Sequence, residues 1–256
     1  MSEALQHLIG LRYCNDEQLN RLLHAADIHR DVLERPVKKV PTLKGKSVVL
    51  LFFEPSTRTR LSFEKAIRSV SANPVNIDIE SSSITKGEGL YDMAQNLKAL
   101  KMDAIVVRHK HGGVPYFLSE VSGIPVINAG DGYHEHPTQG LLDIYTMIKH
   151  CGNMKGKRVL ILGDIRHSRV AKSNIWGLKK LGAEVMVSGP PNLVPQKELE
   201  SIGVRVIKNV DEVLPEVDVV NVLRIQFERQ HQVALASIRE YRHAYGLTAL
   251  RQSQLK

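Results

Sequence analysis

The sequence predicts an α/β protein of two doubly wound domains, each with a mostly parallel sheet, and three observations support this. Short apolar runs alternate along the chain with segments whose apolar residues recur at helical spacing. The alternation is interrupted by the polar, glycine-containing segment 151–157 and then resumes. A length of 256 residues suits two domains of ordinary size. We therefore expect a first domain at residues 1–150 and a second at residues 151–256.

The elements of the first domain follow from these patterns in turn. A capping box at Asn15–Gln18 precedes leucines on one helical face, so the first helix begins there and ends by about Pro36. After it, apolar runs predict strands and periodic apolar residues predict the helices between them. The expected strands cover residues 46–53, 75–79, 104–107 and 125–127, and the expected helices cover 59–70, 88–100, 115–121 and 137–150.

The second domain repeats the alternation. Its expected strands cover residues 158–162, 184–187, 204–207 and 217–223, with helices at 168–181 and near 211–214. A strand that enters a turn at Gly163–Asp164 is typical of dinucleotide-binding domains, but the sequence there lacks the GxGxxG phosphate loop. We therefore expect no nicotinamide cofactor, and the sequence indicates no other cofactor.

Composition narrows the class of protein. With 43% hydrophobic and 24% charged residues, no apolar run of membrane-spanning length and no signal peptide, the chain is expected to be cytoplasmic, without a membrane partner. The net charge is +8, but the basic residues are scattered and only 5% of residues are aromatic. Small anionic substrates explain this charge better than nucleic acid. Cys14 and Cys151 lie far apart and suggest neither a disulfide nor a zinc site.

The segment Ser56–Arg60 predicts an anion site. It lies between a buried strand and a helix, with Ser56 or Thr57 as the natural N-cap. Arg58 and Arg60 then occupy the first turn, where the helix dipole is already positive. Hydroxyls, backbone N–H groups and two guanidinium groups would converge there, which favours a phosphate. The alternative is a surface helix start whose arginines extend into water.

Two further polar segments follow strands. Arg108 comes after an apolar run, and taken alone it could be a solvated strand-end arginine. His136 precedes the helix started by Pro137, where it could donate a hydrogen bond to a developing oxyanion, with Gln139 one turn further on. His134 and His136 could also suggest a metal, but no third ligand is near in the sequence, so we expect no metal.

A loop and two arginines complete the candidate site. The polar segment 81–89 is either a solvated loop or a lid that brings Lys86 to an anion. Arg169 and Arg224 follow strands of the second domain, and guanidinium groups suit carboxylates. We therefore expect phosphate binding in the first domain, carboxylate binding in the second, and the active site in the cleft between them.

Together these motifs closely resemble the aspartate/ornithine carbamoyltransferase family. They span nearly the whole chain in the family's order: Ser56–Arg60, Lys86–Glu88, Arg108–His109, His136–Gln139, Gly163–Arg169 and Arg224–Arg229. The Arg224–Gln226 segment favours the aspartate branch, because ornithine enzymes carry a motif built around Ser-Met-Gly that this sequence lacks. The ornithine branch is the less favoured alternative.

The resemblance implies that the α-amine of L-aspartate attacks carbamoyl phosphate, giving N-carbamoyl-L-aspartate and phosphate in pyrimidine biosynthesis. It implies catalytic roles for Arg58, Thr59, Arg108 and His136, with no metal or cofactor. The residues implied to bind carbamoyl phosphate are Ser56, Thr57, Arg58, Thr59, Ser82, Lys86, Arg108, His136 and Gln139. Those implied to bind aspartate are Lys86, Arg169, Arg224 and Gln226. Ser82 and Lys86 would come from a neighbouring subunit, so a homo-oligomer, typically a trimer, is expected.

The sequence departs from the family at its end. Relatives continue through a His-Pro-x-Pro-type loop and a C-terminal helix, whereas this sequence stops at Gln252–Lys256. We therefore expect an incomplete active site with weak or absent turnover. A non-catalytic binding or scaffold subunit is the alternative function. Association with regulatory or dihydroorotase subunits stays open.

Overall fold

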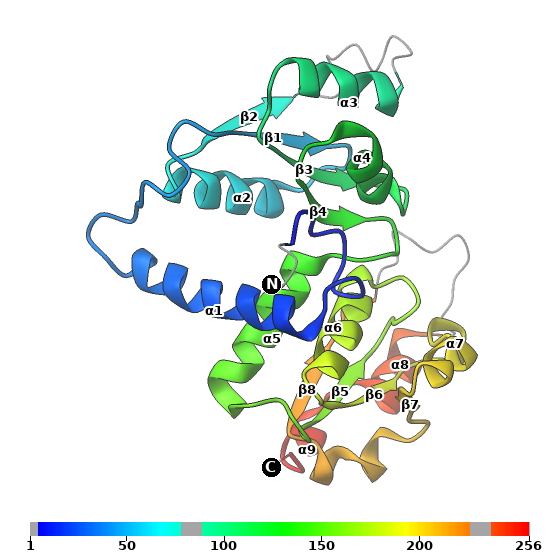
Figure 1. Ribbon diagram of the computed structural model, residues 1–256. Coiled ribbons are helices and arrows are strands. Elements are labelled where there is room, and N and C mark those ends of the chain that lie inside the picture. The colour runs from blue at the N-terminus through cyan, green and yellow to red at the C-terminus, as the bar shows by residue number, and fades with distance from the viewer. Residues whose placement is uncertain (1–4, 78–88, 226–236, 256) are drawn as a thin grey trace. The chain divides into compact units, whose positions relative to one another are not determined.

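The computed structural model describes residues 5–77, 89–225 and 237–255. Its contacts divide the chain into two compact units, residues 1–138 and 139–256. This division falls in the first turn of helix α5 (Pro137–Cys151), whereas the sequence analysis placed the domain boundary after that helix. Each unit contains one parallel sheet and the helices that cover it (Figure 1). The parallel sheets confirm the predicted α/β fold class.

The first unit has a four-stranded parallel sheet in the order β2-β1-β3-β4. Its strands are β1 (Ser47–Phe52), β2 (Asn73–Ile77), β3 (Ala104–His109) and β4 (Val126–Asp131). Its helices are α1 (Asp16–Leu33), α2 (Thr57–Ser69), α3 (Leu90–Ala99) and α4 (Val114–Ser122). The predicted capping box is confirmed, because the side chains of Asn15 and Gln18 each accept a hydrogen bond from the other residue's backbone N–H.

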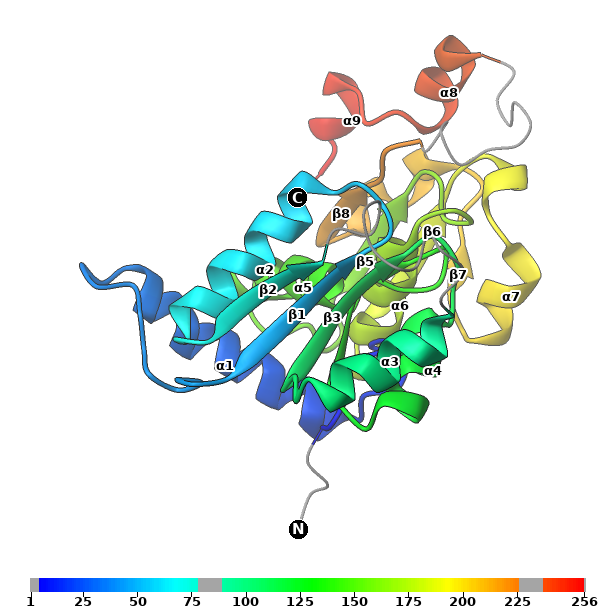
Figure 2. The same ribbon diagram turned by 90° about the horizontal axis from the view of Figure 1, so that it is seen from above.

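Alternate residues of β1 explain the layers of this unit. Val49 and Leu51 point to one face of the sheet, where they pack in a core with residues of α3 and α4. Val48 and Leu50 point to the other face, where Ile67 of α2 covers them. A strand buried on both faces reads as a continuous apolar run, and helices on both faces make the sheet doubly wound (Figure 2).

The second unit has a parallel sheet in the order β7-β6-β5-β8. The strands are β5 (Arg158–Leu162), β6 (Glu184–Ser188), β7 (Arg205–Val206) and β8 (Val219–Val222). The remaining helices are α6 (Arg169–Lys180), α7 (Gln196–Ser201), α8 (Ile238–Tyr245) and α9 (Ala249–Gln252), with short 3₁₀ turns at Pro191–Leu193, Val210–Glu212 and Leu214–Glu216. None of the helices in the described ranges is long and apolar enough to cross a membrane.

Strand register brings the predicted site segments to common sheet edges. Phe52 at the end of β1 pairs with Arg108 on β3, and His109 pairs with Asp131 at the end of β4. The segments that leave these parallel strands therefore start at one edge of the first sheet. In the second sheet Leu162 of β5 pairs with Val222 of β8. The segments that follow these two strands therefore also start at one edge of their sheet.

Candidate active site

The start of α2 presents hydroxyl, backbone and guanidinium groups at the carboxyl edge of the first sheet. Ser56 is in the N-cap position and donates its Oγ hydrogen to Thr59 Oγ1 over 2.9 Å. In the described part of the chain, the Ser56 side chain makes no capping bond to the backbone of this turn. Ser56 therefore does not occupy the backbone N–H groups of the first turn, and these can donate to another acceptor. Thr57 and Arg58 are exposed beside them, an arrangement suited to an anion.

Arg60 differs from the expectation that both arginines of this turn would point at one ligand. Its guanidinium carbon lies 5.5 Å from the ring centroid of Phe52, over the ring face. A cation in this position is attracted by the ring quadrupole. An anion that bound Arg60 would have to compete with this contact, so we expect Arg58 to be the main arginine ligand at this turn.

Arg108 links three segments of the first unit. Its side chain is largely buried at the end of β3, where Nη1 donates to the Ala129 carbonyl over 3.2 Å. Its Nε lies 3.3 Å from Glu54 Oε2, in the loop that follows β1. The alternative of a solvated strand-end arginine is therefore wrong. Because Glu54 neutralises Arg108, an anionic ligand would have to compete with this carboxylate.

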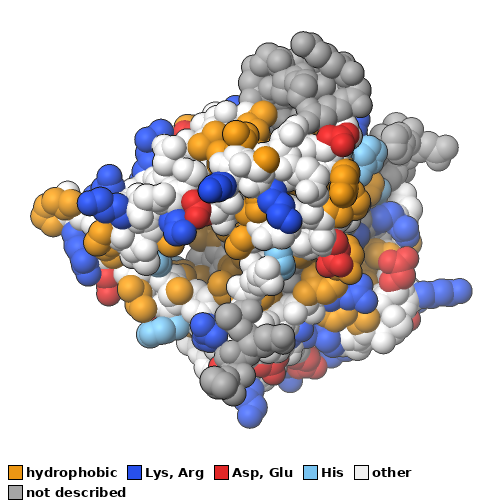
Figure 3. Space-filling model, turned by 45° about the horizontal axis from the view of Figure 1, so that its top comes forward, with side chains coloured by type: hydrophobic (Ala, Val, Ile, Leu, Met, Phe, Trp, Pro, Cys, Tyr) orange, Lys and Arg blue, Asp and Glu red, His pale blue; other side chains and the backbone are white. Residues whose placement is uncertain are grey.

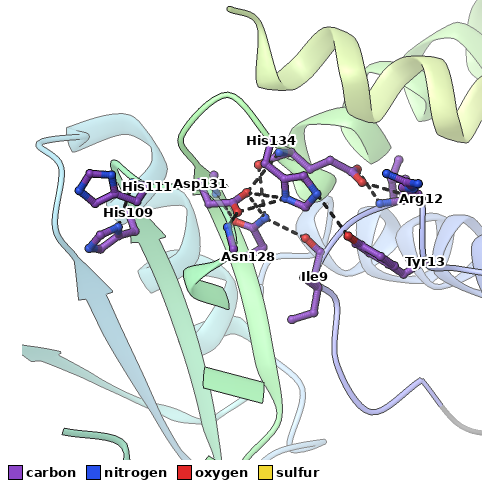
Figure 4. A network of polar contacts seen from close by, with 12 residues as sticks. Ile9, Arg12, Tyr13, His109, His111, Asn128, Asp131 and His134 are labelled. Carbon is purple, nitrogen blue, oxygen red and sulfur yellow. Dashed lines mark hydrogen bonds and ion pairs between the residues drawn. The ribbon is translucent and has the colours of Figure 1, made fainter. Parts of the chain in front are cut away.

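His136 follows a turn that is fixed by a buried polar network (Figure 4). Asn128, fully buried on β4, donates Nδ2 hydrogens to the Ile9 carbonyl over 2.8 Å and to Asp131 Oδ1 over 2.7 Å. Asp131, also fully buried, accepts the backbone N–H of Gly113 through Oδ2 over 2.8 Å. Buried polar groups satisfied in this way hold one backbone arrangement.

Glu135 ties the same turn to the N-terminal segment. It is 1% exposed, and its two carboxylate oxygens accept the backbone N–H groups of Leu11 over 2.7 Å and Arg12 over 3.2 Å. The next residue, His136, is 7% exposed, and its Nδ1 lies 3.4 Å from Thr138 Oγ1. The imidazole of His136 is therefore held on a rigid turn, as an oxyanion donor needs to be.

His134 belongs to this network. Its Nδ1 lies 3.1 Å from Asp131 Oδ2 and its Nε2 lies 3.4 Å from the Tyr13 hydroxyl (Figure 4). Over residues 5–77, 89–225 and 237–255, no group of three or more His, Cys, Asp or Glu side chains is placed to hold a metal ion.

The buried side chain of His109 is expected to make the free energy of unfolding depend on pH. Its side chain is 8% exposed, and Nδ1 accepts the His111 backbone N–H over 2.9 Å. Burial, and secondarily the charge of His111, lowers the pKa of His109 from 6.5. The unfolded chain therefore binds this proton more readily. The neutral ring thus contributes stability that is complete above pH 6.5 and is lost as the pH falls through the folded-state pKa.

Replacing His109 by asparagine, which keeps an acceptor near the Nδ1 position, is expected to flatten this dependence. Urea unfolding of the variant between about pH 7 and pH 5 should show a smaller loss of unfolding free energy than the wild type. The same substitution at His24, exposed on α1, should keep the wild-type slope. Equal slopes for His109→Asn and the wild type would contradict the assignment.

Gln139, in the first turn of α5, is part of a chain of hydrogen bonds. Its Nε2 donates to Asp143 Oδ1 over 2.9 Å, and Asn174 Nδ2 on α6 donates to Asp143 Oδ2 over 2.8 Å. The Gln139 amide is thereby oriented, with its nitrogen directed to Asp143.

The second unit places two arginines after neighbouring strands. Arg169, 4% exposed, is the first residue of α6, and Ser168 caps that helix by accepting the Ala171 N–H over 3.1 Å. Arg224 is exposed just after β8. Because β5 and β8 are adjacent and parallel, both arginines leave the same edge of the sheet.

The turn between β5 and α6 is held by Asp164. This carboxylate is fully buried, and its Oδ1 accepts the His167 backbone N–H over 3.1 Å and lies 2.9 Å from His167 Nδ1. Burial, and secondarily the charge of Asp164, raises the pKa of the nearby Tyr241 hydroxyl. A cationic helix start on a fixed turn suits a carboxylate ligand.

Comparison with known proteins identifies the family. Residues 6–149 match the family model described as the aspartate/ornithine carbamoyltransferase carbamoyl-P binding domain. The chain belongs to the aspartate/ornithine carbamoyltransferase family. It is 52% identical over 251 residues to a protein of Carboxydothermus hydrogenoformans named aspartate carbamoyltransferase catalytic subunit, with 98% of this chain and 80% of that protein covered. A catalytic subunit of the same name from Halothermothrix orenii is 50% identical, with 100% and 82% covered.

Solved structures of carbamoyltransferases have the same fold. Aspartate transcarbamoylase of Trypanosoma cruzi in complex with carbamoyl phosphate and aspartate superposes with a TM-score of 0.83 at 28% identity, covering 98% of this chain and 82% of that one. The catalytic subunit of M. jannaschii aspartate transcarbamoylase gives 0.78 at 33% identity, covering 94% and 79%. The predicted resemblance is confirmed, and the chain is a transferase by family.

The structure describes some residues of the carbamoyltransferase motifs and leaves others outside the described ranges. Ser56, Arg108 and His136 lie at one edge of the first sheet, and Arg169 and Arg224 lie at one edge of the second. Ser82, Lys86 and Gln226 lie outside the described residues. Their roles, like those of the other site residues, stay predictions.

Sequence reasoning missed the residues that support this carbamoyltransferase site. These are Glu54 beside Arg108, Asp143 beside Gln139, and the Asn128–Glu135 network behind His136. A signal existed for Asp143, because residues four apart on a helix share a face. The contacts of Glu135 with Leu11 and Arg12 join segments far apart in the sequence, and no local pattern marks them.

Proposed function

We propose that this chain is the catalytic chain of an aspartate carbamoyltransferase, which transfers the carbamoyl group of carbamoyl phosphate to L-aspartate. The observation that carries the proposal is the open start of α2 with Arg58, at the same sheet edge as Arg108 and His136. This arrangement occurs in a chain half identical to proteins named as catalytic subunits of that enzyme. The products would be N-carbamoyl-L-aspartate and phosphate.

The chemistry needs positioning and charge stabilisation. The amine nitrogen of aspartate attacks the carbonyl carbon, and a C–N bond forms while the carbonyl oxygen takes up negative charge. The bond between the carbamoyl carbon and the bridging oxygen then breaks with its electron pair going to that oxygen, and the amine proton passes to the phosphate that leaves. Ser56, Thr57, Arg58 and Thr59 would bind the phosphate. Thr59, Arg108 and His136 would stabilise the oxyanion, and Gln139 would bind the carbamoyl amide.

The aspartate would be bound by the second unit. Arg169 and Arg224 offer guanidinium groups for its two carboxylates, with Gln226 and Lys86 as further proposed ligands. Ser82 and Lys86 are proposed to come from a neighbouring copy, in a cytoplasmic homotrimer that serves pyrimidine biosynthesis. Regulatory or dihydroorotase subunits are further candidate partners.

The basic surface agrees with small anionic substrates. Figure 3 shows lysine and arginine side chains interspersed with acidic, hydrophobic and other side chains over the visible face. The positive charge is not gathered there into the continuous stripe that nucleic-acid binding uses.

The test is product formation by the purified chain with carbamoyl phosphate and L-aspartate, measured as N-carbamoyl-L-aspartate. L-ornithine in place of aspartate is the control, and it should give no product. Product from ornithine alone would assign the chain to the other branch of the family. A folded sample that binds carbamoyl phosphate but forms no product from either amino acid would favour the non-catalytic binding chain.

A further inference from the structure

Helices α5 and α6 hold the carboxylate of Asp143 from two sides. Gln139 Nε2 donates to Oδ1 over 2.9 Å, and Asn174 Nδ2 donates to Oδ2 over 2.8 Å. Gln139 and Asp143 are four residues apart on α5 and therefore share a face of that helix. Each carboxylate oxygen thus receives one amide N–H, and the carboxylate cannot rotate without breaking both bonds.

A carboxylate in this position selects one orientation of the Gln139 amide. An ionised carboxylate only accepts hydrogen bonds, so it must face the Nε2 hydrogens and not Oε1. Oε1 then points away from Asp143 as an acceptor. The NH₂ of a carbamoyl group is a donor and needs such an acceptor.

We propose that Asp143 is a positioning residue, which orients Gln139 so that its Oε1 accepts an N–H of the carbamoyl group. The inference rests on the proposed function, in which Gln139 binds that group. Asp143 would thereby give the site its preference for carbamoyl phosphate over an acyl phosphate of the same shape that has a methyl group in place of the NH₂.

The hydrogen bonding of Asn174 supports this proposal, because its amide nitrogen binds Asp143 while its amide oxygen is left without a hydrogen bond within the described ranges. The residue is fully buried on α6, and in the described part of the chain its Oδ1 is buried without a hydrogen-bond partner. A buried, unsatisfied carbonyl oxygen costs stability. The amide nevertheless directs its N–H to Asp143, as expected if the carboxylate must be held in place.

Without Asp143 the Gln139 amide is free to turn over. The turned amide presents Nε2 to the carbamoyl NH₂, so two donors face each other and the hydrogen bond is lost. Acetyl phosphate has a methyl group at that position and donates no hydrogen bond, so its binding does not depend on the orientation of Gln139. Removing the negative charge of Asp143 affects both anions alike and cancels in the ratio of their dissociation constants.

The experiment measures dissociation constants of carbamoyl phosphate and acetyl phosphate by calorimetry for the wild type and variants of the full chain. For Asp143→Ala we expect carbamoyl phosphate to lose about fivefold in affinity relative to acetyl phosphate. Gln139→Ala should lower the affinity for carbamoyl phosphate relative to acetyl phosphate, the affinity ratio, by a similar factor. The double variant should lower this ratio by no more than Gln139→Ala alone.

Two further variants keep the test decisive. Asp143→Asn keeps the shape and can pair with either orientation of Gln139, so it should lower the ratio by about twofold and serves if the alanine variant does not fold. Asp103→Ala is the matched control. It removes a carboxylate that also accepts two hydrogen bonds, from Lys46 and Ser47, but just before β3 begins, and it should keep the wild-type ratio.

The outcomes separate this inference from the proposed function. An unchanged ratio in the Asp143 variants, with a lowered ratio in Gln139→Ala, would overturn the positioning role and leave the function standing. Equal weakening of both ligands in the Asp143 variants would show a structural role only and would overturn it too. A folded wild type that binds no carbamoyl phosphate would overturn both the function and the inference.

Discussion

Replacing Arg58 by alanine is expected to lower kcat for carbamoyl transfer by about a hundredfold to a thousandfold. Arg58 is exposed at the start of α2, where it adds to the first-turn N–H groups and the helix dipole. Loss of one preorganised group at a site of developing charge typically has an effect of this size. Steady-state production of N-carbamoyl-L-aspartate measures it, and the melting temperature should stay close to that of the wild type.

Arg60→Ala is the matched control for this prediction. It removes the same charge from the same helical turn, but the guanidinium of Arg60 lies over the ring of Phe52. We expect a change in kcat of less than about threefold and a loss of stability of about 0.5–1 kcal/mol. Equal losses of activity in the two variants would mean that the turn supplies a general positive potential and that Arg58 has no specific role.

Asn128→Ala is expected to lower the free energy of unfolding by about 3 kcal/mol. The Asn128 side chain is fully buried, it donates to Ile9, Asp131 and Glu135, and its Oδ1 accepts the Gly130 N–H over 2.7 Å. Alanine leaves these partners buried with no replacement for Asn128. Thermal unfolding measures the effect, with an expected fall in Tm of about 6–12 °C.

The activity of Asn128→Ala should fall as well, because the turn that holds His136 loses its support. Asn76→Ala is the control, since Asn76 is exposed on β2 and donates over 2.6 Å to Glu64. Its effect on stability should stay within about 0.5 kcal/mol. If the two alanine variants had equal melting temperatures, the network around Asn128 would not be what holds this turn.

The sequence predicted the elements that apolar patterning determines. Helix α1 with its capping box and strand β5 lie where the patterns placed them. Strands β3 and β4 extend to His109 and Asp131, beyond their apolar runs, because pairing with a neighbouring strand continues into the polar residues. Helices α7, α8 and α9 are short, and the sequence analysis did not predict them.

The sequence predicted those residues of the candidate site that belong to local motifs. Ser56–Thr59 and His136 became candidates because a hydroxyl-rich helix start and a proline-started helix are typical of anion and oxyanion sites. The partners that fix these residues could not be found, since Glu54 and Arg108 meet only once two strands pair. The contact of Arg60 with Phe52 was missed for a related reason. The attraction of Arg60 to Phe52 competes with any ligand, and the sequence does not show which contact is stronger.

The contacts between the N-terminal segment and β4 have a consequence for synthesis on the ribosome. Leu8 pairs with Ile127, and the Leu8 N–H donates to the Val126 carbonyl over 2.8 Å. Glu135 accepts from residues more than 120 positions earlier. The ribosome must therefore release nearly the whole first unit before Leu8, Leu11 and Arg12 can find these partners. Such long-range closure slows folding, and until it is complete the apolar surface of this unit stays exposed to aggregation.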